Sequence, residues 1–143
     1  MSSVWCVVVG DARQCGVVEL TDFRVVARNL PEHARNPIHT DDGARAAGFP
    51  AALVAGVTTY AYLTNPLLRG WGMDWLARGS AVVRLRAPVF AGDLLVCQPV
   101  DRERIDGWVD SPDDVRADIQ ASRTEAREIG SLDAVTEPLR PIT

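Results

Sequence analysis

The fold is decided by one uncharged, mostly apolar stretch, AALVAGVTTYAYL, at residues 51–63. If this stretch is helical, apolar side chains surround nearly the whole helix, and such a helix is buried on most of its surface. It is too short to cross a bilayer, which requires about 20 apolar residues. The sequence therefore predicts a long central helix over residues 51–63 that the protein's own sheet covers.

Strand-like segments lie on both sides of this helix in the sequence. Alternating or β-branched residues predict strands over residues 4–9, 16–20, 79–88, 94–100, 115–122 and 131–137. The first two could pair with each other or cap a sheet edge. We expect the strands at 79–88 and 94–100 to form a hairpin. In the first of these, Arg84 and Arg86 fall on the face opposite the apolar residues.

The remaining segments carry turn and cap signals. Apolar residues at helical spacing behind Thr21-Asp22, a typical N-cap, predict a helix over residues 23–30. The other segments are predicted to be a loop at 31–42, a helical turn at 42–47, an irregular segment at 67–76, a strand end and loop at 101–114 and a turn at 125–130. The sum is a single α+β domain over residues 1–143, with a curved antiparallel sheet around one long helix.

Composition and charge exclude several classes of function. The net charge is -4 and no basic run occurs, so we expect no nucleic-acid partner, because phosphate binding needs clustered positive charge. All 15 basic residues are arginine, which excludes a lysine Schiff base. The three cysteines form no C-x-x-C pair, so we expect no disulfide framework, no metal site and no cofactor. Without a leader or a membrane-length apolar run, we expect a cytoplasmic protein with no membrane partner.

A candidate functional loop precedes the predicted central helix. In Asn36-Pro37-Ile38-His39, the proline fixes the backbone and the asparagine can bond its own backbone, which together hold the histidine on a turn. His39 is therefore either an acid/base group or a residue that only ties the loop together. Loops on a rigid scaffold are where chemistry is usually placed.

Two motifs in order carry a resemblance to a known family. The sequence Asn36-Pro37-Ile38-His39-x-Asp41, then Gly48-Phe49-Pro50, Gly56 and the run RAPVFAGD at 86–93, resembles the MaoC-like (R)-specific enoyl-CoA hydratase and dehydratase family. The resemblance covers about residues 20 to 100. It implies a hot-dog fold, a homodimer or larger assembly, and a substrate that is a thioester of coenzyme A or of an acyl carrier protein.

The resemblance also implies roles for particular residues. His39 would be the acid/base group, Asn36 would hold the loop, and the Gly56 N–H at the helix start would polarise the thioester carbonyl. The family's catalytic aspartate, however, is replaced by Ala34, and the histidine that usually precedes the helix glycine is replaced by Ala55. The carboxylate of the expected catalytic pair is therefore missing.

Several residues could replace the missing carboxylate. Glu32 or His33 could reach in from the same loop, although a solvated loop histidine is the plainer interpretation of His33. Asp41 or Asp42 could orient His39, whereas Asp41 could also cap the next helical turn. Alternatively, the reaction needs only one proton-transfer group, as in an intramolecular addition, an isomerisation or an elimination with a good leaving group.

Three further residues are candidates for binding the substrate. Thr64 either packs in the core or donates a hydrogen bond in an acyl pocket, and Trp71 either lines a pocket or covers the core. Arg86, like Arg84, is either part of a solvated strand face or a contact for a pantetheine phosphate.

The sequence thus predicts a lyase of the MaoC-like class, in specialised metabolism, with His39 and Gly56 at its centre. The alternative is a non-catalytic hot-dog subunit that binds an acyl chain or pairs with an active partner. A hot-dog thioesterase is a third possibility, but residues 51–63 offer no carboxylate for it.

Overall fold

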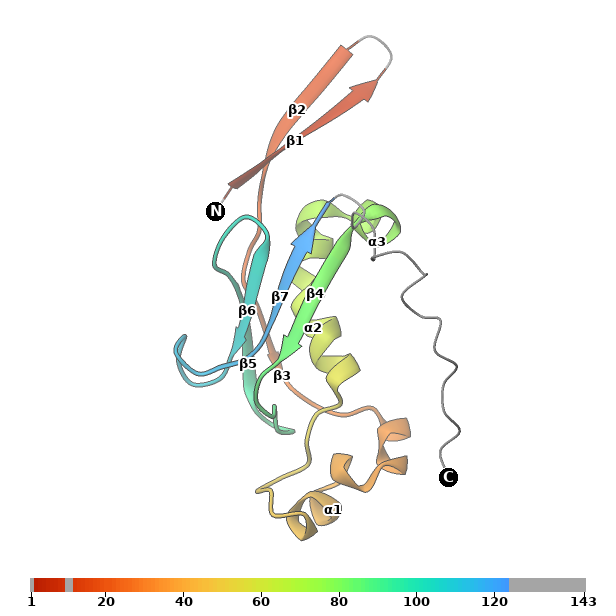
Figure 1. The fold of residues 1–143 in the computed structure, drawn as a ribbon, viewed down its shortest axis with the longest axis vertical. Coiled ribbons are helices and arrows are strands. Elements are labelled where there is room, and N and C mark those ends of the chain that lie inside the picture. Colours follow the sequence, from red (N-terminus) through yellow and green to blue (C-terminus); the bar gives the residue numbers. More distant parts are fainter. Residues whose placement is uncertain (1, 10–11, 124–143) are drawn as a thin grey trace, which may run out of the picture.

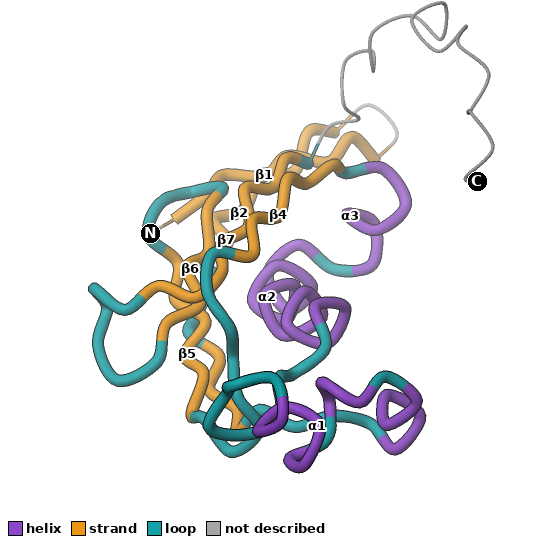
Figure 2. Tube along the Cα trace, turned by 60° about the horizontal axis from the view of Figure 1, so that its bottom comes forward, coloured by secondary structure: helices purple, strands orange, loops and turns teal. Residues whose placement is uncertain are grey.

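The computed structural model describes residues 2–9 and 12–123 of the 143-residue chain. Its main layer is a five-stranded, curved, antiparallel sheet with one long helix packed on one face (Figures 1 and 2). From edge to edge the strands are β3 (Phe23–Val26), β5 (Leu94–Pro99), β6 (Arg104–Trp108), β7 (Val115–Ser122) and β4 (Ser80–Leu85). This architecture confirms the α+β prediction.

The two strands predicted near the start of the chain are also present. β1 (Ser2–Val9) and β2 (Ala12–Glu19) pair with each other as an antiparallel hairpin, separate from the five-stranded sheet. Figure 1 shows this hairpin extending beyond one end of the sheet. The predicted turn at 125–130 and strand at 131–137 lie outside the described residues.

The helix predicted over residues 23–30 is wrong, because this segment begins as a strand. Phe23–Val26 is β3, which pairs with β5 so that Phe23 lies opposite Cys97. The β-branched Val25 and Val26 suit an extended backbone, and the hydrogen bonds to β5 outweigh the helical spacing of the apolar residues. The chain then continues into two short 3-10 helices, η1 (Pro31–Arg35) and η2 (Pro37–His39). The predicted loop therefore has regular local structure.

The long helix exists, but its bounds differ from the prediction. α2 runs from Gly56 to Trp71, so residues 51–55 lie outside it and the first half of the segment predicted to be irregular lies inside it. Residues 52–54 are extended instead, because Val54 N–H bonds to Val89 O and Ala91 N–H bonds to Ala52 O, at 2.7 and 2.8 Å. A shorter helix, α3 (Met73–Arg78), follows directly. The predicted helical turn at 42–47 is α1 (Asp41–Ala46).

The predicted hairpin between 79–88 and 94–100 is also wrong. β4 pairs with β7, whereas β5 lies at the other side of the sheet between β3 and β6. The intervening residues cross the end of the sheet, where they bond to residues 52–54. Residues 104–108, predicted to be a strand end and loop, form the central strand β6.

The core lies between α2 and the sheet. Leu63 and Leu67 of the helix pack against Leu95, Ile105 and Ile119 of the central strands, and all five are fully buried. Burial of each such side chain contributes about 2 kcal/mol relative to exposure in water. This packing fixes the helix, and with it Gly56, against the sheet.

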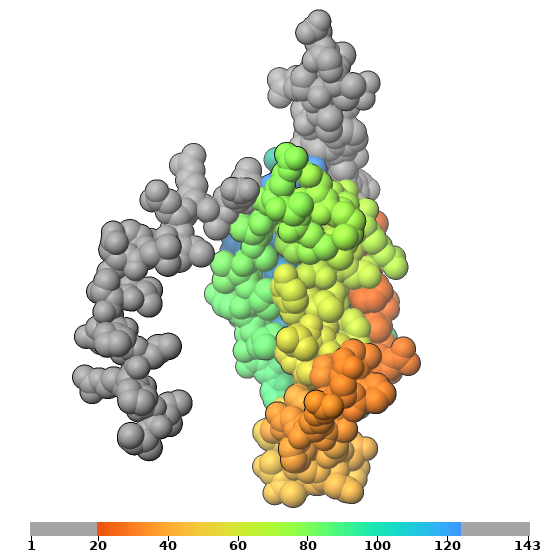
Figure 3. All heavy atoms as spheres, turned by 90° about the vertical axis from the view of Figure 1, so that its right-hand side faces the viewer, coloured from red at the N-terminus to blue at the C-terminus, as the bar shows by residue number. Residues whose placement is uncertain are grey.

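One flank of α2 is not covered, contrary to the expectation that the helix is buried nearly all round. Val57 is 70% exposed and Tyr60 is 38% exposed. Figure 3 shows the first half of the helix, in yellow, at the surface between β4 and the segment that precedes α1. Within the described residues, no helix is long and apolar enough to cross a membrane.

Candidate functional site

His39 is held at the end of η2 by its own loop. Asn36 is the N-cap of η2, and its side-chain oxygen accepts a hydrogen bond from Ile38 N–H at 3.3 Å. Pro37 occupies the first helical position, where its missing N–H costs nothing. The backbone N–H of Leu53 donates to Ile38 O at 3.0 Å, which fastens the loop to the segment before α2.

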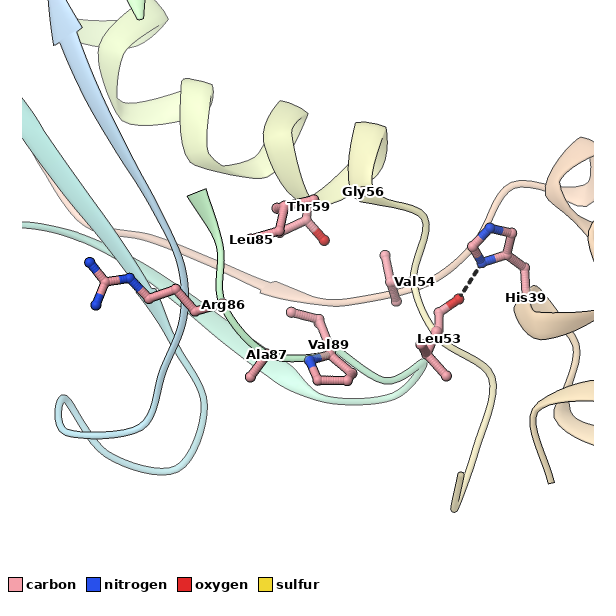
Figure 4. A pocket seen from close by; sticks show the side chains of 10 residues that line it. His39, Leu53, Val54, Gly56, Thr59, Leu85, Arg86, Ala87 and Val89 are labelled. Carbon is pink, nitrogen blue, oxygen red and sulfur yellow. Dashed lines mark hydrogen bonds between the residues drawn. The ribbon is translucent and has the colours of Figure 1, made fainter. Parts of the chain in front are cut away.

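The imidazole of His39 is oriented by a carbonyl group. Its Nδ1 lies 2.7 Å from Leu53 O, and since a carbonyl can only accept, Nδ1 carries the proton (Figure 4). In the neutral ring, Nε2 then has the free lone pair, on the edge of the ring away from this bond. No described residue hydrogen-bonds to Nε2 of His39. The ring is therefore a base whose accepting nitrogen is available.

Asn29 joins the His39 loop to the start of α2. Its amide nitrogen donates to Leu53 O at 2.7 Å and to His39 O at 3.1 Å. Its side-chain oxygen accepts from Ala55 N–H at 2.9 Å. One side chain thus fixes the carbonyl that orients the imidazole and the residue that caps the helix.

The first turn of α2 presents N–H groups without partners. Thr58 and Thr59 N–H both donate to Ala55 O, but no described residue accepts from Gly56 or Val57 N–H. Such orphan N–H groups and the helix dipole together favour a negative charge at this end. A Cβ on Gly56 would lie 2.8 Å from Leu85 Cδ1, so glycine also permits the close approach of β4.

His39 and Gly56 line the same cavity, which has a volume of about 360 Å³ (Figure 4). Its other walls are mostly apolar and come from residues 53–54, Thr59, Leu85 and residues 86–89. The cavity therefore brings together a base, the positive end of a helix and an apolar surface. This combination suits a reaction in which charge develops on an oxygen of an otherwise apolar substrate.

Arg86 borders this cavity, and its guanidinium is paired with a buried carboxylate. Its Nε lies 2.6 Å from Oδ2 of Asp118, which is completely buried. Arg84 Nε lies 3.3 Å from Oδ1 of the same carboxylate, and Arg104 lies 3.9 Å from it. A buried carboxylate with three arginines explains why Arg84 and Arg86 are not a simple solvated face.

A second ion pair supports the cavity wall. Arg116 binds Asp114 through two hydrogen bonds of 2.8 Å and also donates to Pro88 O, which lies in the wall, at 2.6 Å. The hydrogen bond from Arg116 holds the pKa of the Asp114 carboxyl below its usual range. Asp114 thereby positions the guanidinium that fixes Pro88.

Three of the residues proposed from the sequence are engaged elsewhere. The Asp41 carboxylate accepts a hydrogen bond from Ala52 N–H at 2.9 Å, and the cap of α1 is Thr40 rather than Asp41. Thr64 is buried in α2, where its hydroxyl donates to Ala61 O at 2.7 Å. Trp71 belongs to the core. None of the three lines the His39 cavity.

Glu32 and His33 lie on η1 and border a different cavity of about 420 Å³. The rings of His33 and His39 are neighbours, with centroids 5.9 Å apart. Glu32 does not approach His39 closely, since no described carboxylate lies within ion-pair distance of that imidazole.

Two important residues escaped the sequence analysis. Asn29 carried no signal, because it falls within a segment of apparent helical spacing and its partners are distant in the chain. Asp118 did carry a signal, because it is a carboxylate in the middle of a predicted strand, on the polar face of that strand.

The described residues contain no cluster of three potential metal ligands. Burial raises the pKa of the Cys97 thiol to about 12, which makes this cysteine a poor nucleophile.

A comparison with models of known protein families finds no match to this chain. A comparison with curated proteins finds no match either. The family and the activity are accordingly matters for proposal.

Proposed function

We propose that this chain is a hot-dog protein of the MaoC-like class, a cytoplasmic lyase that acts on an acyl thioester of coenzyme A or an acyl carrier protein. One observation carries the proposal: the imidazole of His39 and the first N–H of α2, at Gly56, line a single apolar cavity. The packing of one long helix on a five-stranded antiparallel sheet agrees with the fold that the sequence resemblance implies.

The cavity suggests how a thioester would be bound. The thioester carbonyl accepts a hydrogen bond from Gly56 N–H, where the helix dipole stabilises the negative charge of an enolate. The acyl chain lies against the apolar side chains of Val54, Leu85 and Val89. In this pose the α-carbon of the substrate faces His39.

A single imidazole is sufficient for an elimination in this cavity. His39 Nε2 removes the α-proton of a 3-hydroxyacyl thioester, and the electron pair of that C–H bond forms the enolate. The pair then forms the C=C bond as the β-carbon–oxygen bond breaks, and the same proton passes from His39 to the departing oxygen, which leaves as water. The imidazole returns to its neutral form, so no second acid/base group is consumed.

The absence of a carboxylate favours some reactions over others. Hydration requires activation of a free water, which Ala34 cannot provide and which no described carboxylate next to His39 replaces. By microscopic reversibility the loss of water passes through the same transition state and is slowed as well, whereas elimination of a better leaving group, or addition of a nucleophile that the substrate itself carries, avoids that requirement. These reactions suit an enzyme of specialised metabolism.

The arginines beside the cavity offer a site for the carrier of the acyl group. Arg86 and Arg84 keep about half of their side-chain surface exposed, at 44% and 55%, while both contact Asp118. Their remaining N–H donors can bind a pantetheine phosphate at the cavity entrance. Asp118 holds the guanidinium groups in place for this contact.

The proposed assembly is a homodimer through β4. This strand lies at the edge of the sheet, so one side of its backbone has no neighbouring strand among the described residues. Exposed apolar side chains surround it, including Leu85 at 58% and Val57 at 70%. A second copy that pairs along β4 would satisfy the backbone and cover this apolar surface.

The alternative, a non-catalytic subunit that binds an acyl chain, is favoured by one observation. No described carboxylate contacts His39, whereas His39 Nδ1 has a structural bond to Leu53 O. In that case the cavity would bind the thioester without turnover.

Two variants of His39 decide between these functions. His39→Asn retains a side-chain N–H that can bond to Leu53 O but has no base, whereas His39→Ala loses both. With 3-hydroxybutyryl-CoA and crotonyl-CoA as probes, which we expect the wild type to interconvert slowly, both variants should lose at least about 100-fold of that turnover. Only His39→Ala should lose stability.

Binding of the unreactive butyryl-CoA completes this test. The lyase proposal predicts that His39→Asn binds butyryl-CoA as the wild type does. Turnover that survives in His39→Asn contradicts the catalytic role. Wild-type binding without turnover of any 3-hydroxyacyl or 2-enoyl probe supports the non-catalytic subunit instead.

A further inference from the structure

The two histidines of the chain, His33 and His39, lie next to each other although they come from different 3-10 helices. Their ring centroids are 5.9 Å apart and their planes are inclined by 56°. Both side chains are only partly exposed. An acyl substrate bound beside one imidazole is therefore within reach of the other.

The backbone imposes opposite tautomers on these two rings. Leu53 O requires a proton on Nδ1 of His39, at 2.7 Å. Leu30 N–H, in contrast, donates to Nδ1 of His33 at 3.3 Å, so this nitrogen must carry the lone pair. In the neutral rings, the free Nε2 of His39 is an acceptor and the free Nε2 of His33 is an N–H donor.

His33 also belongs to a cavity of its own. This second cavity, of about 420 Å³, is lined in part by Val57 and Thr58 of the first turn of α2. The His39 cavity is lined by Gly56 and Thr59 of the same turn. The helix start and the two imidazoles thus lie between the two cavities.

We propose that His33 is a second substrate-binding and catalytic residue, whose Nε2–H donates a hydrogen bond to the β-oxygen of the acyl substrate. The proposal rests on the thioester function proposed above. His39 moves the proton from the α-carbon to the β-oxygen, while His33 transfers no proton and stabilises the charge that develops on that oxygen. A neutral imidazole can act as such an electrophilic donor.

This arrangement compensates for the loss of the carboxylate at Ala34. In this pair, His33 donates a hydrogen bond that holds the leaving oxygen next to His39. His39 is then the only group that carries a proton from the α-carbon to that oxygen. The substrate class that fits is therefore an acyl thioester with a hydroxyl or ether oxygen on its β-carbon, which lies across the two cavities.

The purely structural role of His33 is that of a cap. His33 is the third residue of η1, and its side chain accepts from the N–H of Leu30, the residue before the helix. Glutamine can take the same capping position. The experiment must therefore separate the cap from the Nε2–H donor.

Nitrogen-15 NMR of the imidazoles tests the proposal without any turnover. Because the chain has two histidines, His33→Gln and His39→Asn each leave one ring, and the assignment is unambiguous. At about pH 9, where imidazoles are neutral, we expect an Nδ1–H ring for His39 and an Nε2–H ring for His33. Addition of racemic 3-hydroxybutyryl-CoA should shift the His33 Nε2 signal, whereas butyryl-CoA, which lacks the β-oxygen, should shift it much less.

The possible results are distinct. A His33 ring with its proton on Nδ1, or a His33 signal that responds equally to both ligands, overturns this inference and leaves the thioester function intact. If neither ligand shifts either ring, the thioester function itself is wrong, and His33 loses its role with it.

Kinetics provide a second measurement where turnover is detected. His33→Ala, which loses both the cap and the donor, should lower kcat/KM by about tenfold, the effect of one lost hydrogen bond. His33→Gln keeps an oxygen for Leu30 N–H and an N–H donor, and should recover most of that loss. The exposed neighbour Arg35, which lies on the same 3-10 helix and lines neither cavity, provides the control, since Arg35→Gln should change neither the tautomers nor kcat/KM. Equal activity of His33→Ala and the wild type overturns the proposal.

Discussion

The Nδ1 atom of His39 and the carbonyl oxygen of Leu53 are 2.7 Å apart, and this single hydrogen bond decides which nitrogen of the imidazole faces the cavity. Leu53 belongs to the extended segment before α2, so the same segment that delivers Gly56 to the helix start also orients the base. The base and the helix terminus are consequently fixed relative to each other by the backbone.

Asn29 should be the residue that maintains this arrangement. Asn29→Ala removes hydrogen bonds to Leu53 O, His39 O and Ala55 N–H, so we expect the free energy of unfolding to fall by about 2–3 kcal/mol. Urea denaturation measures this loss. Asn36→Ala, which removes one exposed bond, is the control and should cost about 1 kcal/mol. An equal or larger cost for Asn36→Ala contradicts the central role of Asn29.

Gly56→Ala should impair binding of the thioester more than folding. The new Cβ meets only the tip of Leu85, which is 58% exposed and can move, so the melting temperature should change little. The displaced side chain narrows the cavity at the Gly56 N–H, and affinity for butyryl-CoA should fall by about tenfold or more. Both quantities can be measured by calorimetry.

Gly72→Ala is the matched control for this substitution. Gly72 has a φ of 75°, where alanine is strained, and it lies away from the cavity. Its replacement should lower the melting temperature and leave the affinity of the folded protein unchanged. If Gly56→Ala instead lowers mainly the melting temperature and Gly72→Ala lowers mainly the affinity for butyryl-CoA, the Gly56 N–H does not bind the thioester carbonyl.

Asp114→Asn should reduce stability in a pH-dependent way. The pKa of Asp114 is lowered in the folded protein by its hydrogen bond from Arg116, so the carboxylate stabilises the fold above about pH 4, and this contribution is lost as the pH falls. The difference in melting temperature between wild type and variant should therefore be present at neutral pH and shrink progressively as the pH falls below about 4. Its neighbour Asp113, which has no ion pair among the described residues, is the control. If the difference in melting temperature is as large at low pH as at neutral pH, the hydrogen-bonded pair of Asp114 and Arg116 is not its cause.

Tyr60→Glu should dissociate the proposed dimer. Tyr60 lies on the exposed flank of α2 and borders a shallow apolar pocket with Val83 and Leu85 of β4. A charge there is harmless in a monomer and costly in a β4 interface. Light scattering after gel filtration should show a dimer for the wild type and a monomer for Tyr60→Glu. Leu76→Glu, 52% exposed on α3, should remain dimeric. A monomeric wild type contradicts the proposed assembly.

The parts of the fold that were predicted correctly are those that local sequence determines. Val115–Ser122 was predicted to be a strand with its observed bounds, because its apolar residues alternate along the chain and Ala117, Ile119 and Ala121 lie buried on one face. The His39 turn was likewise recognisable, because Asn36 and Pro37 act within three residues.

The predictions are wrong where contacts between residues far apart in the sequence determine the secondary structure. The segment at 23–30 has helical spacing, but pairing with β5, some 70 residues later, makes it a strand. The start of α2 could not be located, because Ala55 provides no side-chain cap and its N–H is bound by Asn29 from 26 residues earlier. The turn-like residues after β4 suggested a hairpin, although they cross the sheet to reach β5.

The measurement that most directly tests the central claim is a spectrophotometric assay with crotonyl-CoA on the wild type and on Ala34→Asp. Ala34 stands where the resembled family has its water-activating aspartate, on the 3-10 helix that precedes the His39 loop. We predict that the wild type hydrates crotonyl-CoA slowly and that Ala34→Asp hydrates it faster. If both proteins are inactive while folded and neither binds butyryl-CoA, His39 and Gly56 do not form a thioester site.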